Sequence, residues 1–310
     1  IRNNSANRGG GITCYHSSSP TLKNISISAN SSNLNGGGIY TYNGSNPSLL
    51  NVAITNNTAV NGGGGMDMYS NSKPTLTNVT ISGNTSDANG GGFQLSENSH
   101  ITLVNGIMWN NSPQEIYFEQ TSSNDSITVS YSNIEGGQAS IVTDDNGTVN
   151  WGDGNVNIDP IFVNADSGDY HLSDLSPVIS AAASEVTIDG VTYTAPTTDI
   201  EGNPRPNPAG TVPDMGAYEN ENGAGPYNGP VWYVDASSEL PYANGSESAK
   251  FSKIQYGINA AAAGDTVSVA AGTYVENINF NGKNIAVIGE DRETTIIDGN
   301  QTGPIVVFNN

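Results

Sequence analysis

The chain has 310 residues, 13% of them charged, and a formal net charge of −21. This acidic excess repels nucleic acid and anionic membrane surfaces, so we expect neither as a partner, and polyuronates only where a cation bridges. No run of about 18 apolar residues occurs, which predicts no membrane insertion. Cys14 is the only cysteine, so an intrachain disulfide is excluded. Abundant Asn, Ser, Thr and Gly favour turn-rich β structure over a helical bundle.

A strict repeat of 27 residues extends from the start of the sequence to about residue 112. Between successive glycine clusters, apolar residues alternate in short segments, which is strand periodicity. Units this short cannot bury an apolar face alone, but they can do so by stacking on the next unit. The sequence therefore predicts an all-β solenoid whose glycine clusters form corners with positive φ. The turn glycines are Gly11, Gly38, Gly65 and Gly92, and the apolar columns are Leu22, Leu49, Leu76 and Leu103 with Ile27, Ile54, Ile81 and Met108.

Asparagines recur at the same spacing. Stacked coils bring equivalent residues to about 4.8 Å from each other, where amides can hydrogen-bond to one another and to turn backbone. We expect two ladders, with Asn3 as a further first member of the second. Their members are Asn24, Asn51, Asn78 and Asn105, then Asn30, Asn57, Asn84 and Asn111.

These units, with the pattern N-x-GGGI…P-x-L-x-N-V-x-I-x-x-N-T, resemble those of secreted bacterial right-handed parallel β-helix repeat proteins. The resemblance covers nearly the whole chain and implies a right-handed parallel β-helix. It also implies an extracellular or bacterial cell-surface location. Enzymes that act on polysaccharides share this fold, so fold alone does not decide the function.

Outward-facing side chains of the repeats are the candidates for a functional site. Asp67 is the only ionisable residue in its column, and a paired-carboxylate hydrolase needs a second acid about 5 to 10 Å away. Glu97 and Asp87 are expected in turns, so we predict no catalytic cluster. A column of tyrosines could bind sugar rings by their apolar faces or could simply stabilise the sheet. The candidate glycan-binding residues are Tyr15, Tyr40, Tyr42 and Tyr69.

Oxygen-bearing side chains alternate in the segment DNGTVNWGDGNVNIDP, within irregular coils that follow the strict repeat. An extended turn could present several of these oxygens to one hard cation. Ordinary Asp and Asn turn chemistry explains the same pattern. Calcium is therefore the one cofactor considered, with candidate ligands Asp153, Asn155, Asn157 and Asp159.

The order of the later segments is unusual. GNPRPNPAGTVPDMGAYE, residues 202–219, resembles the choice-of-anchor type of segment that closes a β-helix in this family. Residues 220–231 suggest a linker. A short capping helix is expected near 252–263, followed by GDTV-x-V-x-x-GTY-x-E-x-I, which resembles the opening of a β-helix. We therefore expect the C-terminal part of one β-helix over 1–219 and the first coils of a second or continuing β-helix over 232–310.

This order suggests a window of a longer protein, or a polymer repeat unit, with solenoid coils at both ends open to the same or a neighbouring polypeptide. The leading hypothesis is a non-catalytic structural or adhesive module of an extracellular bacterial surface protein or fibre. The alternative is a polysaccharide lyase, hydrolase or carbohydrate-binding module on the same fold.

Overall fold

The computed structural model describes residues 1–120, 124–143, 147–223, 225, 227–238, 243–301 and 303–308. Contacts divide the chain into two compact units, 1–221 and 222–310. Strands dominate both units, and one α-helix is present among the described residues. No helix in these ranges is long and apolar enough to cross a membrane.

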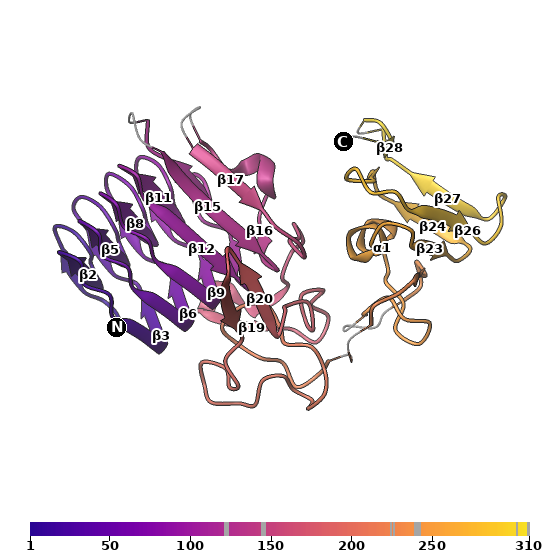
Figure 1. Ribbon diagram of the computed structural model, residues 1–310, viewed down its shortest axis with the longest axis horizontal. Helices are drawn as coiled ribbons and strands as arrows, with labels where there is room; N and C mark the ends of the chain where they lie inside the picture. The colour runs from indigo at the N-terminus through magenta and orange to yellow at the C-terminus, as the bar shows by residue number, and fades with distance from the viewer. Residues whose placement is uncertain are drawn as a thin grey trace. The chain divides into compact units, whose positions relative to one another are not determined.

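The first unit is a parallel β-solenoid, whose strands stack side by side from the indigo to the magenta part of Figure 1. Three sheets run along the stack. The smallest contains β1 (Ser5–Ala6), β4 (Ser31–Ser32), β7 (Thr58–Ala59) and β10 (Thr85–Ser86). The second contains β2 (Ile12–Tyr15), β5 (Ile39–Tyr42), β8 (Met66–Tyr69), β11 (Phe93–Ser96) and β14 (Ile116–Phe118). The third contains β3 (Thr21–Ser28), β6 (Ser48–Thr55), β9 (Thr75–Ser82), β12 (His100–Val104), β13 (Ile107–Trp109), β15 (Asp125–Ser130), β16 (Asn133–Ile134) and β17 (Gly147–Trp151).

Successive coils stay in one register. In the third sheet, Leu49 of β6 lies opposite Leu22 of β3 and Leu76 of β9. In the second sheet, Met66 of β8 lies opposite Ile39 of β5 and Phe93 of β11. Inward side chains such as these form one continuous core cluster along the stack. The predicted solenoid and its 27-residue register are confirmed.

The glycine clusters form tight corners for two different reasons. Positive φ belongs to the glycine two positions before the last one of each cluster, as at Gly36 (φ +67°). The last glycine, such as Gly38, instead lies against the next coil, where an added Cβ would be 2.6 Å from the carbonyl oxygen of Gly65. The predicted turn glycines Gly11, Gly65 and Gly92 are in the same kind of close contact with backbone oxygen. A side chain is excluded there by the stacking of coils rather than by φ.

Residues after the strict repeat form shorter and more varied elements. The 3₁₀ helix η1 (Gln138–Ser140) precedes β17, and η2 (Ala165–Ser167) lies between β18 (Phe162–Asn164) and β19 (Asp169–Leu172). β18 and β19 are antiparallel, as are β20 (Glu185–Ile188) and β21 (Val191–Thr194). The chain therefore leaves the parallel winding in this part of the first unit.

The second unit starts a new set of parallel coils and holds the α-helix. α1 spans Ile254–Ala260, shorter than the expected 252–263, and it buries Ile254 and Ile258. The strands pair in the orders β22-β23-β26, β24-β27 and β25-β28. Their bounds are β22 (Val231–Val234), β23 (Thr266–Val269), β24 (Gly272–Val275), β25 (Ile278–Asn279), β26 (Ala286–Gly289), β27 (Thr295–Asp298) and β28 (Val306–Val307).

Charged side chains stabilise both termini of α1. The carboxylate of Glu276 accepts hydrogen bonds from the backbone N–H groups of Ile254 (2.8 Å) and Gln255 (3.1 Å). At the other terminus, Lys283 Nζ donates to the carbonyl oxygens of Ile258, Asn259 and Ala261 at 2.6–3.0 Å. An anion at the N-terminus and a cation at the C-terminus both interact favourably with the helix dipole.

Candidate functional site

Tyrosines line the outer face of the second sheet. The rings of Tyr42 and Tyr69 stack with centroids 5.6 Å apart and an interplanar angle of 18°, while Tyr15 meets Tyr42 edge to face. Tyr15 is 41% exposed, but Tyr40 is only 5% exposed, with Arg8 5.7 Å from its ring centroid. The structure thus brings the four predicted tyrosines together. Tyr15, Tyr42 and Tyr69 remain accessible to a ligand, whereas Tyr40 is covered.

Asp67 lies beside these rings in an unusual environment. Its column neighbours across the strands are Tyr40 and Gln94, and its side chain is buried although it points away from the core. Asn35 Nδ2 donates to Oδ2 at 3.0 Å, while Oδ1 has no hydrogen-bond partner in the described residues. Burial raises the pKa of Asp67 to about 8, although the Asn35 amide acts in the opposite direction. A carboxyl group that holds its proton near neutral pH is the type found at general acids and bases.

Two further acids lie on this face, and the sequence-based expectation that Asp67 has no acidic neighbour is wrong. Glu119 follows Phe118, which is buried in the core, so alternation turns Glu119 outward, and its negative charge adds to the raised pKa of Asp67. Glu97 is in a turn, as expected, but its carboxylate accepts a 2.5 Å hydrogen bond from the Tyr69 hydroxyl. That hydrogen bond is the main cause that raises the pKa of Tyr69 to about 12. The alternating residues Ile116 and Phe118 were the signal that could have placed Glu119.

The second predicted asparagine ladder is continuous. Each Nδ2 donates to the Oδ1 of the next member, at 3.0 Å from Asn30 to Asn57, 2.9 Å from Asn57 to Asn84 and 2.8 Å from Asn84 to Asn111. Each Oδ1 also accepts from the backbone N–H of the previous member. The second N–H of each amide donates to a backbone carbonyl, such as that of Ile27. The amide hydrogen-bonding groups are therefore used within the stack.

Both limits of this ladder differ from the expectation. Asn4, rather than Asn3, donates to Asn30 Oδ1 at 3.0 Å, because the first coil is one residue shorter at this point. Beyond Asn111 the acceptor is the buried carboxylate of Glu115, at 2.6 Å from Asn111 Nδ2. Burial raises the pKa of Glu115 to about 8, against the effect of its hydrogen bonds with Asn111.

The first predicted ladder is interrupted. Asn51 donates to Asn24 Oδ1 (3.1 Å) and Asn105 to Asn78 Oδ1 (3.2 Å), but Asn78 Nδ2 donates to the carbonyl oxygens of Asp214 and Gly216. All four asparagines have positive φ, which asparagine tolerates better than most residues. Their corner is thus open to hydrogen bonds from another part of the chain.

Residues 198–219, which we name the strap, form these hydrogen bonds with the corner asparagines. The strap includes the predicted closing segment. It contacts three successive coils from the side. Thr198 O accepts from Asn51, and the Gly216 N–H donates to Asn105 O at 2.8 Å. Asn78, on the coil between them, binds Asp214 and Gly216 as described. The segment that the sequence suggested as a closure therefore lies along the stack instead of across it.

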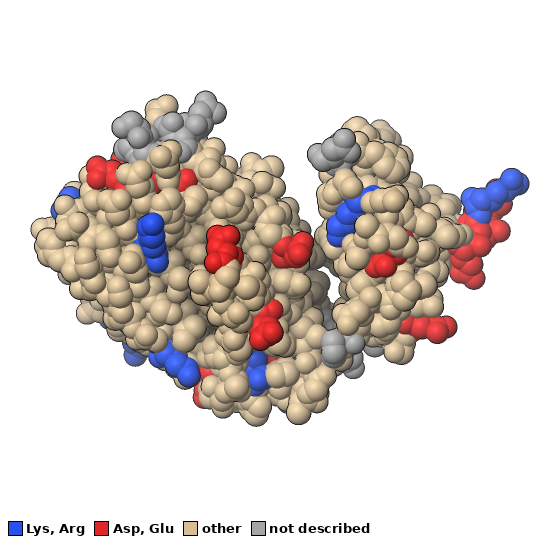
Figure 2. Space-filling view, in the orientation of Figure 1, with Lys and Arg blue, Asp and Glu red and all other residues tan. Residues whose placement is uncertain are grey.

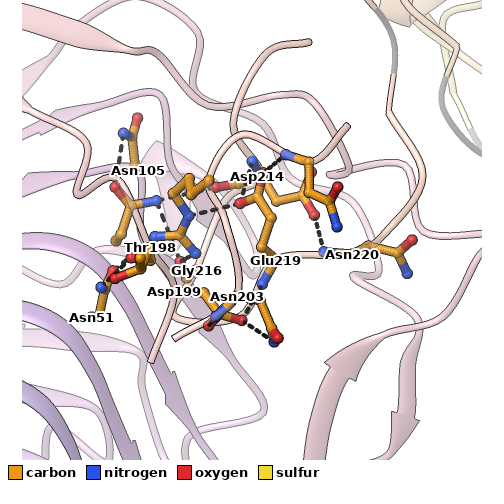
Figure 3. Close-up of polar contacts among 12 residues, drawn as sticks. Asn51, Asn105, Thr198, Asp199, Asn203, Asp214, Gly216, Glu219 and Asn220 are labelled. Atoms are coloured by element: carbon orange, nitrogen blue, oxygen red, sulfur yellow. Dashed lines mark hydrogen bonds and ion pairs between the residues drawn. The ribbon is translucent and has the colours of Figure 1, made fainter. Parts of the chain in front are cut away.

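A buried ion pair fixes the strap (Figure 3). Arg205 Nε lies 2.6 Å from Glu219 Oε2, and both side chains are fully buried. Arg205 also donates to Asn51 Oδ1 (2.8 Å) and to the carbonyl oxygen of Gly216 (3.1 Å). Asp214 accepts from the backbone of Ser180 and Asn220, each at 2.7 Å. Burial raises the pKa of both Asp214 and Glu219, and Arg205 acts in the opposite direction on each.

Comparison with known protein families agrees with this architecture. Residues 10–173 match the family model described as the right handed beta helix region. The chain belongs to the right-handed β-helix family. No curated protein and no solved structure matches this β-helix protein.

The predicted calcium ligands of this β-helix protein are used in hydrogen bonds of the irregular coils. Asn155 Oδ1 accepts from Ser132 N–H at 3.0 Å, and Asn157 Oδ1 accepts from Gly136 N–H at 2.9 Å. Asp159 accepts from the backbone of a nearby residue, and the backbone oxygen of Asp153 accepts from Tyr131 N–H. Within the described ranges, no group of three or more His, Cys, Asp or Glu could hold a metal ion. Calcium binding at these residues stays a prediction.

Proposed function

We propose that this β-helix protein is a non-catalytic structural or adhesive module of an extracellular bacterial surface protein or fibre. The observation that supports this role best is the use of the repeated polar residues. The asparagines of the second ladder bind one another, and Asn51, Asn78 and Asn105 of the first ladder bind the strap, so both sets hold coils together. Buried amide ladders and a buried ion pair suit a module whose task is to keep its shape.

The location and the assembly belong to the same proposal. Few charged side chains appear on the face shown in Figure 2, and the proportion of Asn, Ser, Thr and Gly suits a polar exterior rich in turns. We place the module outside the cell on the basis of its resemblance to secreted β-helix proteins, including the choice-of-anchor type of segment. In the described residues, β1 and β2 each pair with one strand, and we propose that the same or a neighbouring polypeptide supplies further coils of the stack.

The test of the structural role is location combined with form. Antibodies against the purified chain should label intact cells of the source organism, and electron microscopy should place the label on surface layers or fibres. Labelling confined to the cytoplasm would contradict the proposal. Turnover of a polysaccharide that is abolished by Asp67→Asn would replace it with the enzymatic alternative.

A glycan-active or glycan-binding site is the second candidate, and a specific observation favours it. Asp67 with its raised pKa, the outward Glu119 and the accessible rings of Tyr42 and Tyr69 share one face. Aromatic faces bind the apolar sides of sugars, and paired acids can serve hydrolysis. This arrangement makes polysaccharide a candidate partner and Asp67 a candidate acid.

Matched variants separate binding from catalysis in this second candidate. Tyr42→Ala should weaken retention on a glycan array if the tyrosine face binds sugars, whereas the control Tyr193→Ala, on the β20–β21 hairpin, should not. Asp67→Asn should abolish the release of reducing ends or of unsaturated products if the site is catalytic. Equal retention by the parent and Tyr42→Ala would remove the tyrosines from any binding role.

A further inference from the structure

His171 joins the strap to a strand that precedes it in the sequence. On β19, His171 Nδ1 lies 2.6 Å from Oδ1 of Asp169. On the other side of the ring, Nε2 lies 3.2 Å from Oε2 of Glu201, which belongs to the strap. The imidazole also packs against the ring of Tyr218 in the strap, with centroids 4.4 Å apart. One imidazole therefore contacts two carboxylates and an aromatic ring, and two of these three partners are in the strap.

The alternation of side chains along β19 explains why His171 can reach the strap. Tyr170 and Leu172 are buried, whereas Asp169 and His171 are only partly buried on the opposite face of the strand. Tyr170 packs edge to face on Phe162 of the neighbouring strand β18, with centroids 5.3 Å apart. The strand is thus held through its buried face, and a contact from His171 ties the strap to a fixed element.

Glu201 lies in a turn that a buried aspartate organises. Asp199 Oδ1 accepts hydrogen bonds from the backbone N–H groups of Glu201 and Asn203, each at 2.9 Å. Asp199 is fully buried, whereas Glu201 is exposed. The residue before Asp199 is Thr198, whose carbonyl oxygen accepts from the corner Asn51. The exposed carboxylate is therefore connected through one short turn to a corner of the stack.

The charge of His171 decides how well it can hold both carboxylates. A protonated imidazole donates from both nitrogens, whereas the neutral ring has only one N–H. Partial burial acts to lower the pKa of His171, but the hydrogen bonds with Asp169 and Glu201 outweigh burial and raise this pKa above its ordinary value of 6.5. The hydrogen bond with His171 in turn lowers the pKa of Asp169 below its ordinary value of 3.8. The site therefore stabilises the imidazolium and the carboxylate together.

The remaining ionisable groups on the elements around His171 are acids and tyrosines. They are Asp166, Tyr170, Asp174, Asp199 and Tyr218. Residues 162–174 contain no lysine or arginine, and Arg205, the only cation of the strap, is buried and paired with Glu219. These negative surroundings favour the protonated imidazole. Glu219 and Asp214 of the buried network also have raised pKa values, so a test needs variants at His171 and not a change of pH alone.

From the two carboxylate contacts, the packing on Tyr218 and the negative surroundings together, we propose that His171 is a pH-dependent switch of strap attachment, whose protonated ring holds the turn at residues 199–203 on β19 and whose deprotonation loosens that turn. This inference goes beyond the proposed function, because it applies equally to a structural module and to a glycan-active one.

The pH range of the switch follows from the directions of the pKa shifts. Because the pKa of His171 is raised on folding, the attachment is fully present below the ordinary value of 6.5 and is lost as pH rises through the pKa of the folded protein. The lowered pKa of Asp169 sets the acid limit, since its share is lost as pH falls below 3.8. His171, Asp169 and Glu201 are 41%, 41% and 52% exposed, so the expected change is local loosening and not unfolding of the unit.

Hydrogen exchange of the full chain, measured by mass spectrometry and corrected for the intrinsic exchange rate at each pH, tests the switch. In the parent, peptides that cover residues 199–203 should exchange at least about threefold faster at about pH 8.5 than at about pH 6. His171→Gln should show the faster exchange at both pH values. The control His16→Gln, which removes an exposed imidazole from the first coil, should behave like the parent.

An NMR titration of the His171 ring gives a second readout that does not depend on exchange rates. The titration midpoint should lie above 6.5 in the parent and should fall in Glu201→Gln, because the neutral amide attracts the imidazolium less. The control Glu185→Gln, on β20, should leave the midpoint unchanged. A midpoint at or below 6.5 would overturn the switch, as would a His171→Gln variant that keeps the pH dependence of the parent at residues 199–203. Either outcome leaves surface labelling of cells, the test of the proposed function, unaffected.

Discussion

Arg205 and Glu219 form an ion pair at 2.6 Å in which neither side chain is exposed, and the same guanidinium reaches Asn51 on a coil 154 residues earlier. The pair thus joins the strap to itself and to the stack. Loss of one partner would leave a buried charge without compensation, which is the costly way to break such a pair.

Arg205→Met should therefore lower the free energy of unfolding of the first unit by roughly 3–5 kcal/mol. Urea unfolding followed by circular dichroism measures this loss. The matched control is Arg292→Met, since Arg292 is 90% exposed and its pair with Glu293 is at the surface. If the control variant lost as much free energy of unfolding as Arg205→Met, the buried pair would contribute no more to stability than the surface pair.

Asn57→Ala should destabilise the stack because Asn57 joins its neighbours in the second asparagine ladder. The substitution leaves the backbone and side-chain N–H groups of Asn30 without their acceptor and the carbonyl of Ile27 without a donor. Each buried group left unpaired costs about 1–3 kcal/mol, so we expect a total loss of about 2 kcal/mol or more in thermal or urea unfolding. Asn33→Ala, at an exposed position of the same coil, should change stability by less than about 0.5 kcal/mol.

Asp67 should make stability depend on pH in a defined direction. Its pKa in the folded protein, about 8, lies above its ordinary value of 3.8, so the folded state binds this proton more tightly than the unfolded state. The contribution of Asp67 to the free energy of unfolding should therefore fall as pH rises from about 4 to about 8. The Asp67→Asn variant has no titratable group at this position, so its stability lacks this contribution to the pH dependence.

The measurement for Asp67 is the difference in melting temperature between Asp67→Asn and the parent. This difference should shift in favour of the variant between about pH 5 and about pH 8.5. Glu115 titrates in the same direction but is present in both proteins, so the difference isolates Asp67. A difference that stays constant with pH would mean that Asp67 is not protonated in the folded protein.

Lys283→Met should loosen α1 while leaving the first unit unchanged. Three carbonyl oxygens lose a charged donor, and hydrogen bonds to charged groups contribute about 1.5–3 kcal/mol. Hydrogen exchange measured by mass spectrometry should become faster in peptides that cover residues 254–260. Lys250→Met, which removes a 3.6 Å surface pair with Asp235, should leave these peptides as protected as in the parent.

Chelation tests the calcium prediction. Since Asn155 and Asn157 already accept backbone hydrogen bonds, we expect EDTA to leave the melting temperature unchanged. A ligand that binds only the folded state must raise stability, and the gain grows with the logarithm of its concentration once the site is nearly saturated. A melting temperature that rises with added calcium, and loses this rise in Asp153→Ala, would instead support the site.

The sequence was sufficient to predict the solenoid because coil stacking repeats the same local environment. Leu22, Leu49 and Leu76 are equivalent in the structure because their spacing equals one winding. The second asparagine ladder was predicted from the same spacing. An irregularity of one residue cannot be predicted from the spacing. The first member of this ladder is Asn4, whereas the repeat predicted Asn3.

Contacts between distant segments could not be predicted from the repeat. Arg205 lies in the predicted closing segment, residues 202–219. Its distance from Asn51 in the sequence is unrelated to the repeat, so their contact could not be predicted. Asp67 was identified, yet its burial depends on Asn35 and Gln94 from other coils, and its acidic neighbour Glu119 lies beyond the strict repeat. Sites built across coils need the three-dimensional register of irregular segments, which periodicity does not supply.

The strap also affects the order in which the chain can fold during synthesis. In most solenoids each coil can consolidate as soon as the next one has formed. Here the corners at Asn51, Asn78 and Asn105 obtain their last hydrogen-bond partners only after residues 198–219 have been synthesised. Until then these coils expose polar corners that water must satisfy, so full rigidity of the stack comes late, when the strap is in place.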